Sequence, residues 1–255
     1  MSINIVIPMA GQGSRFAKAG YKKPKPFIDV LGRPMIAHVL ENLSMPKARF
    51  ILLARAEHYE KEPETIKWIK NNYPAQFVLI DKLTEGAACT VLHAHRLINN
   101  ETPLLIANSD QLVDMEIAHY LEDSRHRGLD GSVLCFEDNH PKWSYAKLDD
   151  KGLISEIREK QVISPHATVG IYYFERGRDF VENALDMFVR NERVNNEFYV
   201  APVYNYAIKQ VGRNIAEIIR AVQALQMADC ENASTPVNWI PGNPVIVPAP
   251  DTILY

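Results

Sequence analysis

The stretch INIVIPMAGQGSRF (residues 3–16) contains an apolar run that ends at a glycine-rich turn. Short apolar runs bounded by turn residues are typical of buried strands in α/β sheets. Similar runs lie at Phe50–Ala54, Phe77–Ile80 and Leu104–Ala107. Amphipathic segments alternate with them and lie at Pro34–Leu43, Pro63–Asn72 and Ala87–Ile98. This alternation predicts an α/β fold with a Rossmann-like, mostly parallel sheet flanked by helices.

The rhythm changes after about Asp114. We expect helices near Ile117–Arg127, Asp179–Val189 and Pro202–Gln210, and strands at Ser132–Phe136, Tyr145–Leu148, Leu153–Ile157 and Thr168–Phe174. No linker rich in Gly, Pro or Ser separates the two parts, so we expect one domain over residues 1–233, with halves at 1–114 and 115–233. Residues 234–255 contain five prolines, which exclude a regular helix, and we expect an extended Pro-rich tail there.

Composition excludes several classes of protein. A formal charge of −3 over 255 residues argues against a general nucleic-acid or membrane surface, so phosphate chemistry must rest on a local basic cluster. The N-terminus has no basic region before its apolar run, and no apolar stretch reaches the roughly 18 residues of a spanning helix. Three cysteines, Cys89, Cys135 and Cys230, lie far apart, which indicates a reducing, cytoplasmic location.

The first loop has the composition of a phosphate-binding site. Gly11 and Gly13, next to Ala10 and Ser14, leave backbone N–H groups open to phosphate oxygens. Arg15 adds a planar fork suited to phosphate, and Lys25 follows between two prolines. A dinucleotide fingerprint would need a third glycine where Phe16 stands, and a P-loop would need GKS or GKT. A turn without a ligand stays open for the glycines alone.

A carboxylate follows the run Leu104–Ala107. Asn108, Ser109 and Asp110 come directly after it, so Asp110 is expected at the carboxyl end of a central strand, where α/β sheets place their sites. A hard Mg²⁺ ion requires one or two protein carboxylates together with substrate phosphates. The alternative is that Asp110 caps a following helix.

Residues 5–36, IVIPMAGQGSRFAKAGYKKPKPFIDVLGRPMI, resemble the signature of the sugar-phosphate nucleotidylyltransferases, and the likeness extends more weakly to about Ala207. The resemblance implies a nucleotide-diphospho-sugar transferase fold, with residues 1–114 as the nucleotide-binding half and 115–233 as the acceptor-binding half. It implies a triphosphate cradle formed by Ala10, Gly11, Gly13 and Ser14, with the charge balanced by Arg15 and Lys25. It also assigns Asp110 to Mg²⁺ and Ser109 to the nucleotide.

Two further segments resemble parts of this family. Thr84, Gly86 and Ala87 match the loop beside the nucleobase, although the same residues also suit a helix start. Glu159 and Lys160 match a pair that binds the sugar and its phosphate, and Gly170 follows in the next strand on the acceptor side. Taken without its context, a Glu-Lys pair is usually a solvated surface pair.

One feature of the family has no clear match. The resemblance implies a second metal-binding aspartate late in the chain, and Asp229 is the nearest candidate by position. Another residue could supply this ligand, one carboxylate could suffice, or this region could have diverged with weakened activity.

The expected reaction is transfer of a nucleotidyl group from a nucleoside triphosphate to a phosphorylated small molecule, with release of pyrophosphate. Mg²⁺ is the expected cofactor, and Arg15, Lys25 and Asp110 are the expected catalytic residues. Cytidylyl transfer to a polyol or amino-alcohol phosphate stays open, as does a nucleotide-binding protein that has lost catalysis; a dehydrogenase is the weakest alternative. The resemblance suggests capsule or lipopolysaccharide precursor synthesis. A homo-oligomer is left open.

Overall fold

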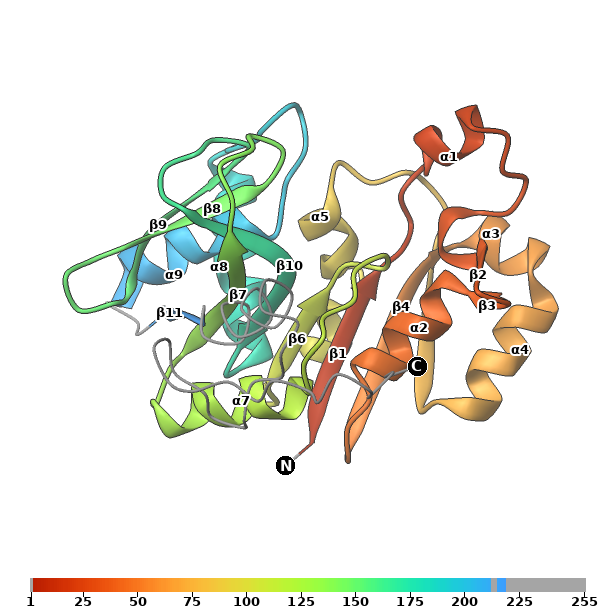
Figure 1. Cartoon of the computed structure of the whole chain (residues 1–255), viewed down its shortest axis with the longest axis horizontal. Coiled ribbons are helices and arrows are strands. Elements are labelled where there is room, and N and C mark those ends of the chain that lie inside the picture. Colours follow the sequence, from red (N-terminus) through yellow and green to blue (C-terminus); the bar gives the residue numbers. More distant parts are fainter. Residues whose placement is uncertain (1, 212–214, 219–255) are drawn as a thin grey trace, which may run out of the picture.

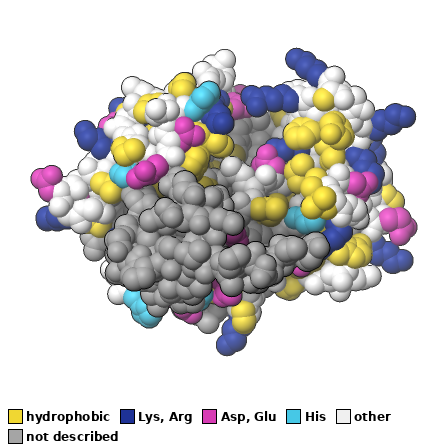
Figure 2. Space-filling view, viewed as in Figure 1, with side chains coloured by type: hydrophobic (Ala, Val, Ile, Leu, Met, Phe, Trp, Pro, Cys, Tyr) yellow, Lys and Arg dark blue, Asp and Glu magenta, His cyan; other side chains and the backbone are white. Residues whose placement is uncertain are grey.

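The computed structural model describes residues 2–211 and 215–218. These residues form a central sheet covered by helices, with a small two-stranded hairpin beside it (Figure 1). The expected α/β fold is confirmed. On the face shown in Figure 2, acidic and basic side chains are interspersed.

The main path of the sheet is mostly parallel, as predicted. Its order is β11 (Ile215–Ile218), β7 (Gly131–Glu137), β10 (His166–Phe174), β6 (Leu104–Ala107), β1 (Ile3–Pro8), β4 (Ala48–Arg55) and β5 (Ala75–Ile80). On this path β10 runs antiparallel to its neighbours β6 and β7, while the other pairs are parallel. An antiparallel pair, β8 (Ser144–Leu148) and β9 (Ile154–Glu159), branches from β10. Because β10 pairs with β6, both halves of the chain share one sheet.

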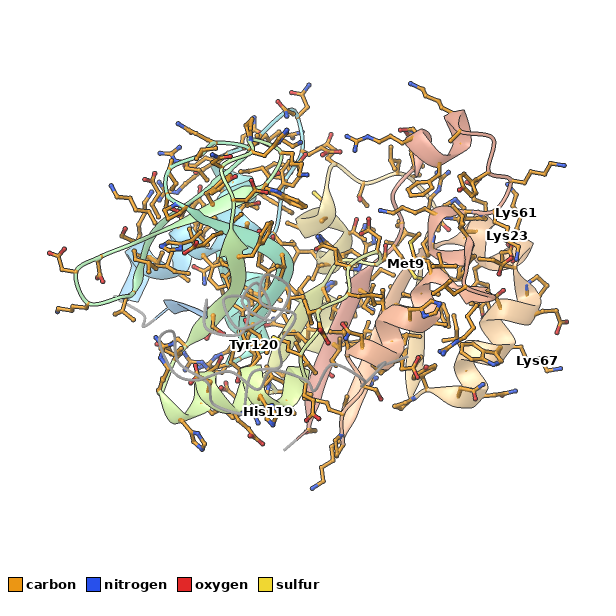
Figure 3. The ribbon with its side chains drawn as sticks, in the orientation of Figure 1. Met9, Lys23, Lys61, Lys67, His119 and Tyr120 are labelled. Carbon is orange, nitrogen blue, oxygen red and sulfur yellow. The ribbon has the colours of Figure 1, made fainter. Side chains whose placement is uncertain are left out.

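The sheet is buried on both faces. On one face, Ile3, Ile5 and Ile7 of β1 share a core with α2 (Met35–Asn42), α4 (Pro63–Asn72) and α7 (Ile117–His126). On the other, Val6 shares a core with α5 (Ala87–Leu92), α8 (Gly177–Val189) and α9 (Tyr204–Val211). Figure 3 shows Tyr120 of α7 at the sheet and Lys67 of α4 pointing outward. Two covered faces explain why β1 is apolar at every position except Asn4, which is also buried, rather than at alternate positions only.

The remaining elements are short. They are α1 (Ser14–Lys18), α3 (Ala56–Lys61), α6 (His95–Ile98), the 3₁₀ turns η1 (Lys25–Phe27) and η2 (Ala201–Val203), and the hairpin strands β2 (Asp29–Val30) and β3 (Arg33–Pro34). The helix predicted over Ala87–Ile98 is split into α5 and α6 by a turn at residues 93–94. In the described part of the chain, no helix is both long and apolar enough to cross a bilayer.

Several sequence predictions fall beyond the described residues. The Pro-rich tail at 234–255, Asp229 and Cys230 belong to this group. Neither of the two described cysteines, Cys89 and Cys135, is part of a disulfide.

Candidate active site

A cleft of about 890 Å³ opens at the carboxyl ends of β1 and β6. Eleven of the residues expected at the site line this cleft: Gly11, Gly13, Ser14, Arg15, Lys25, Ala87, Ser109, Asp110, Glu159, Lys160 and Gly170. They come from five separate parts of the sequence: residues 11–25, 87, 109–110, 159–160 and 170. Three other expected residues, Ala10, Thr84 and Gly86, do not line it, and Ala10 is almost fully buried in the core.

Gly13 shapes the first loop. It has φ +59° and precedes α1, where its carbonyl oxygen accepts hydrogen bonds from the N–H groups of Phe16 (2.9 Å) and Ala17 (3.1 Å). A Cβ atom at this position would lie 3.2 Å from Cβ of Lys25. Only glycine therefore meets both the left-handed conformation and the close approach of Lys25 without strain.

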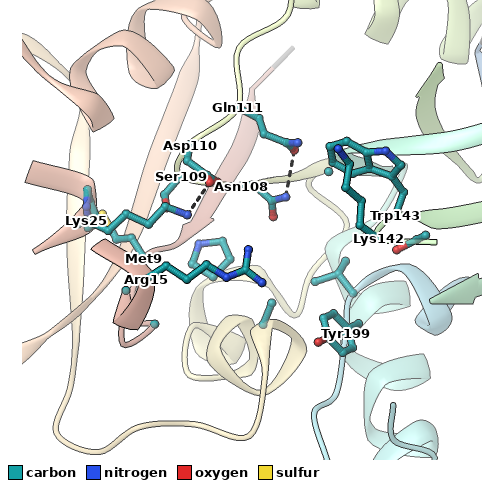
Figure 4. A pocket seen from close by; sticks show the side chains of 18 of the residues that line it. Met9, Arg15, Lys25, Asn108, Ser109, Asp110, Gln111, Lys142, Trp143 and Tyr199 are labelled. Atoms are coloured by element: carbon teal, nitrogen blue, oxygen red, sulfur yellow. Dashed lines mark hydrogen bonds and ion pairs between the residues drawn. The ribbon is translucent and has the colours of Figure 1, made fainter. Parts of the chain in front are cut away.

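Lys25 and Asp110 meet in the cleft although 85 positions separate them. Nζ of Lys25 lies 2.5 Å from Oδ2 of Asp110 (Figure 4). The same ammonium group lies 5.7 Å from the ring centroid of Phe16. Both side chains of the pair are partly exposed, at 26% and 36%, so the pair is open to solvent and to a ligand.

Arg15 differs from Lys25 in having no partner among residues 2–211 and 215–218. Its side chain is exposed, and within the described residues it makes no hydrogen bond or ion pair. Figure 4 shows its guanidinium group reaching into the cleft. An unpaired guanidinium carries its full positive charge and can bind phosphate oxygens through two parallel hydrogen bonds.

The surroundings of Asp110 suit a hard cation. Its Oδ2 accepts from Lys25, and its Oδ1 has no donor within the described residues. These residues contain no group of three His, Cys, Asp or Glu side chains able to hold a metal. An ion at Asp110 would therefore take most of its ligands from phosphate and water, which is how Mg²⁺ is commonly held.

A pair of amides beside Asp110 was not predicted. Nδ2 of Asn108 donates to Oε1 of Gln111 at 3.0 Å (Figure 4). Both amide groups lie close to Gly170. Gly170 has φ +85° at an irregularity in the β10–β7 pairing, and its carbonyl accepts from the Asn108 N–H at 3.1 Å. A Cβ on Gly170 would lie 2.1 Å from Nδ2 of Asn108 and 2.2 Å from Oε1 of Gln111. Gln111 carries no sequence signal that could have identified it.

Gly86 is a glycine for a reason the sequence did not indicate. It has φ +114°, and a Cβ there would lie 2.5 Å from the carbonyl oxygen of Phe198. The backbone of Phe198 crosses it, accepting from Ala88 N–H (3.0 Å) and donating to the Glu85 carbonyl (2.7 Å). Ala87 begins α5 and lines the cleft, so the helix-start interpretation holds here. The predicted role of this loop beside the nucleobase stays a prediction.

The acceptor-side residues lie where β9 ends. Glu159 is hydrogen-bonded to the hydroxyl of Ser144, and burial raises the pKa of its carboxyl group above the ordinary value. Lys160 follows in the left-handed region, at φ +55°, and its ammonium group donates to the hydroxyl of Tyr199 at 2.6 Å.

The wall on this side of the cleft also includes Lys142 and Trp143. Trp143 is fixed by a 2.7 Å hydrogen bond from Nε1 to Asp138, and Nζ of Lys142 lies 4.5 Å from a ring centroid of the indole. From the sequence, Trp143 could contact an acceptor, but an aromatic pair is more often part of the core; in the structure Trp143 lines the cleft.

The chain belongs to the nucleotidyl transferase family, whose model matches residues 5–224. This match confirms the resemblance seen in residues 5–36. It ends within the predicted 1–233 domain, whose boundary stays a prediction.

Two curated proteins match the larger part of this chain. The mannose-1-phosphate guanylyltransferase catalytic subunit beta of Drosophila pseudoobscura pseudoobscura is 25% identical over 177 residues, which is 66% of this chain and 47% of that protein. The bifunctional protein GlmU of Methanocaldococcus jannaschii is 24% identical over 210 residues, which is 75% of this chain and 48% of that protein. The chain thus spans about half the length of these relatives.

Solved structures show the same fold. A nucleoside-diphosphate-sugar pyrophosphorylase from Vibrio cholerae RC9 has a TM-score of 0.69 and 27% identity, covering 85% of this chain and 92% of that one. A UDP-glucose pyrophosphorylase in complex with UDP-glucose has a TM-score of 0.67, covering 89% and 95%, but at 18% identity it supports the fold alone.

The C-terminal part of the sequence resembles a different family. Residues 224–253 match the C-terminal domain of 1-Cys peroxiredoxin. Peroxiredoxin 2 of Caldanaerobacter subterraneus subsp. tengcongensis is 56% identical over 43 residues, which is 17% of this chain and 20% of that protein. Sequence reasoning found only a Pro-rich tail there, because proline content carries no information about kinship.

Proposed function

We propose that this cleft transfers a nucleoside monophosphate from a nucleoside triphosphate to a sugar phosphate, releasing pyrophosphate and forming a nucleotide sugar. The observation that carries the proposal is the meeting of Lys25 and Asp110 at the glycine-rich loop, with Arg15, which pairs with none of the described residues, lining the same cleft. This arrangement supplies cations for a triphosphate and a carboxylate for a metal ion in one place.

The reaction needs no covalent bond to the protein. An oxygen of the acceptor phosphate attacks the α-phosphorus and forms a new P–O bond. The bond between the α-phosphorus and the β-bridging oxygen breaks, and pyrophosphate leaves with that oxygen and its electron pair. Positioning of the two substrates and stabilisation of charge are sufficient for such phosphoryl chemistry.

The residues divide between the two substrates. The N–H groups of the first loop and Arg15 would bind the triphosphate, and Lys25 would stabilise the charge on departing pyrophosphate. Lys160 would bind the acceptor phosphate from the other side of the cleft. Mg²⁺ held by Asp110 would neutralise charge on the triphosphate; whether Asp229 adds a ligand is part of the proposal.

A sugar phosphate is the acceptor class that the relatives favour, since their names include mannose 1-phosphate and nucleoside-diphosphate sugars. We propose a cytoplasmic enzyme, as the scattered cysteines indicated. We further propose a role in capsule or lipopolysaccharide precursor synthesis and a homo-oligomeric state.

Pyrophosphate release tests the proposal. CTP, UTP, dTTP, GTP and ATP would each be combined with Mg²⁺ and a panel of hexose 1-phosphates, with polyol and amino-alcohol phosphates included. We expect release from one matched pair containing a sugar phosphate. Release only with a polyol or amino-alcohol phosphate would move the assignment to the alternative acceptor class. Nucleotide binding without release for any pair would contradict transfer.

A further inference from the structure

The two lysines of the cleft are held in different ways. Lys25 is paired with the carboxylate of Asp110. Lys160 makes no ion pair within the part of the chain that the structure describes, and its ammonium group donates instead to the neutral hydroxyl of Tyr199 at 2.6 Å. The ammonium group of Lys160 is therefore not engaged by a described carboxylate and is available to a ligand, while its position depends on Tyr199.

The geometry of Tyr199 suits it for orienting an ammonium group. Its hydroxyl donates to Oε2 of Glu197 at 2.5 Å, which leaves the oxygen lone pairs to accept from Lys160. The Lys160 nitrogen also lies 4.7 Å from the centroid of the Tyr199 ring. Burial and the hydrogen bond to Glu197 raise the pKa of the Tyr199 phenol, so the hydroxyl stays protonated and keeps donating to Glu197.

Tyr199 is itself anchored from the nucleotide half of the chain. Its neighbour Phe198 forms backbone hydrogen bonds with Glu85 and Ala88 on either side of Gly86. The side chain of Glu85 also pairs with Arg193, at 2.8 Å. Figure 4 shows Tyr199 on the side of the cleft opposite Lys25. The segment that carries Tyr199 is thus fixed at the same loop that begins α5.

We infer that Tyr199 is a positioning residue that holds the ammonium group of Lys160 in the orientation that binds the acceptor phosphate. This inference rests on the proposed function and deepens it, because it identifies the residue that orients Lys160, the cation on the acceptor side. Tyr199 acts through Lys160, so its hydroxyl matters for the acceptor phosphate and not for the nucleotide.

The experiment is a double-mutant cycle with Tyr199→Phe and Lys160→Ala, measured with the sugar phosphate that the release assay identifies. Tyr199→Phe keeps the ring and removes the hydroxyl. We expect it to raise the KM for the sugar phosphate about tenfold, the scale of a lost hydrogen bond to a charged group, while the KM for the nucleotide stays within about twofold. In the Lys160→Ala background the same change should alter the acceptor KM by less than about twofold.

The chain offers a matched control. Tyr59, outside the cleft, accepts from Nζ of Lys70 at 2.7 Å, with this nitrogen 5.3 Å from its ring centroid. Tyr59→Phe removes the same type of contact and should leave both KM values unchanged. The inference is overturned if Tyr199→Phe behaves like Tyr59→Phe, or if its effect is equally large without Lys160.

Binding separates this inference from the proposed function. Glucose 1-phosphate and mannose 1-phosphate can be titrated by calorimetry into the wild type and the variants of the double-mutant cycle, which measures binding without catalysis. Binding that follows the predicted cycle, together with no turnover for any pair, would refute transfer and leave the role of Tyr199 supported. No binding of either probe to the wild type, in a protein that also lacks turnover, would overturn both.

Discussion

Replacing Gly170 by alanine would place a methyl group in space that two amides now occupy. The added Cβ would lie 2.1 Å from Nδ2 of Asn108 and 2.2 Å from Oε1 of Gln111. Both contacts are at the ends of side chains, so the amides can swing away, but only by breaking the 3.0 Å hydrogen bond between them. The backbone must also hold an alanine at φ +85°.

The expected cost is the sum of two effects. A non-glycine residue in the left-handed region costs roughly 1–2 kcal/mol. The lost hydrogen bond adds about 1 kcal/mol. Gly170→Ala should therefore lower the free energy of unfolding by about 2–3 kcal/mol, equivalent to a fall in Tm of roughly 5–10 °C for a domain of this size.

Gly152→Ala is the matched control, because Gly152 has φ +73° and no atom within 4 Å of the added Cβ. It should lower the free energy of unfolding only by the cost of the left-handed backbone, roughly 1–2 kcal/mol. The difference between the two variants in urea unfolding then gives the cost of the lost amide contact. When both variants are assayed under conditions in which they are folded, Gly170→Ala should also have lower turnover than Gly152→Ala, since the displaced amides adjoin Asp110. Equal destabilisation by the two substitutions, with normal turnover in both, would refute this account of the amide pair.

Three further predictions follow from other contacts. Gly86→Ala should lower the free energy of unfolding by roughly 3 kcal/mol or more, because its Cβ would meet backbone atoms of Phe198 that cannot swing away. A smaller loss of stability than that of Gly170→Ala, in the same urea assay, would contradict this. Glu159 has a raised pKa, so the folded state binds its proton more tightly than the unfolded chain, and wild-type stability should fall as pH rises above 4.5 towards that pKa. Glu159→Gln should lack this fall, and a stability difference between the two proteins that is independent of pH would refute the assignment. Lys25→Ala and Asp110→Asn should each lower turnover by about 10²–10³-fold. Each should change the free energy of unfolding by less than about 1 kcal/mol, because the pair is partly exposed. Parallel losses of turnover and Tm would indicate that the pair is structural instead.

The fold was predictable because its signals are local. The apolar run Ile3–Met9 and its counterparts follow from burial on both faces of a parallel sheet, which any single strand displays in its own sequence. The reversed direction of β10 was not predictable, since an apolar strand does not encode the direction of its neighbours. The break between α5 and α6 was also missed, because amphipathic periodicity continues through a single turn.

The site was predictable only in part, for a related reason. Lys25 and Asp110 each carry a local signal, a proline-flanked cation and a carboxylate after a strand, but their contact depends on the relative placement of β1 and β6. Gly86 was noticed as a glycine, yet its close neighbour is the backbone of Phe198, 112 positions later in the numbering. Tyr199 carries no local sequence signal, because its contact is with Lys160, 39 positions earlier in the numbering and on the same side of the cleft.

An isotope experiment tests the central claim most directly. A hexose 1-phosphate labelled with ¹⁸O in its phosphate group would be incubated with the matched nucleoside triphosphate, Mg²⁺ and the protein, and the products followed by ³¹P NMR and mass spectrometry. If the acceptor phosphate attacks the α-phosphorus, all of the label stays in the nucleotide sugar and the pyrophosphate is unlabelled, and Asp110→Asn suppresses both products. Label in the released pyrophosphate or in inorganic phosphate, or formation of free nucleoside monophosphate without a nucleotide sugar, would contradict the assignment of this cleft to nucleotidyl transfer.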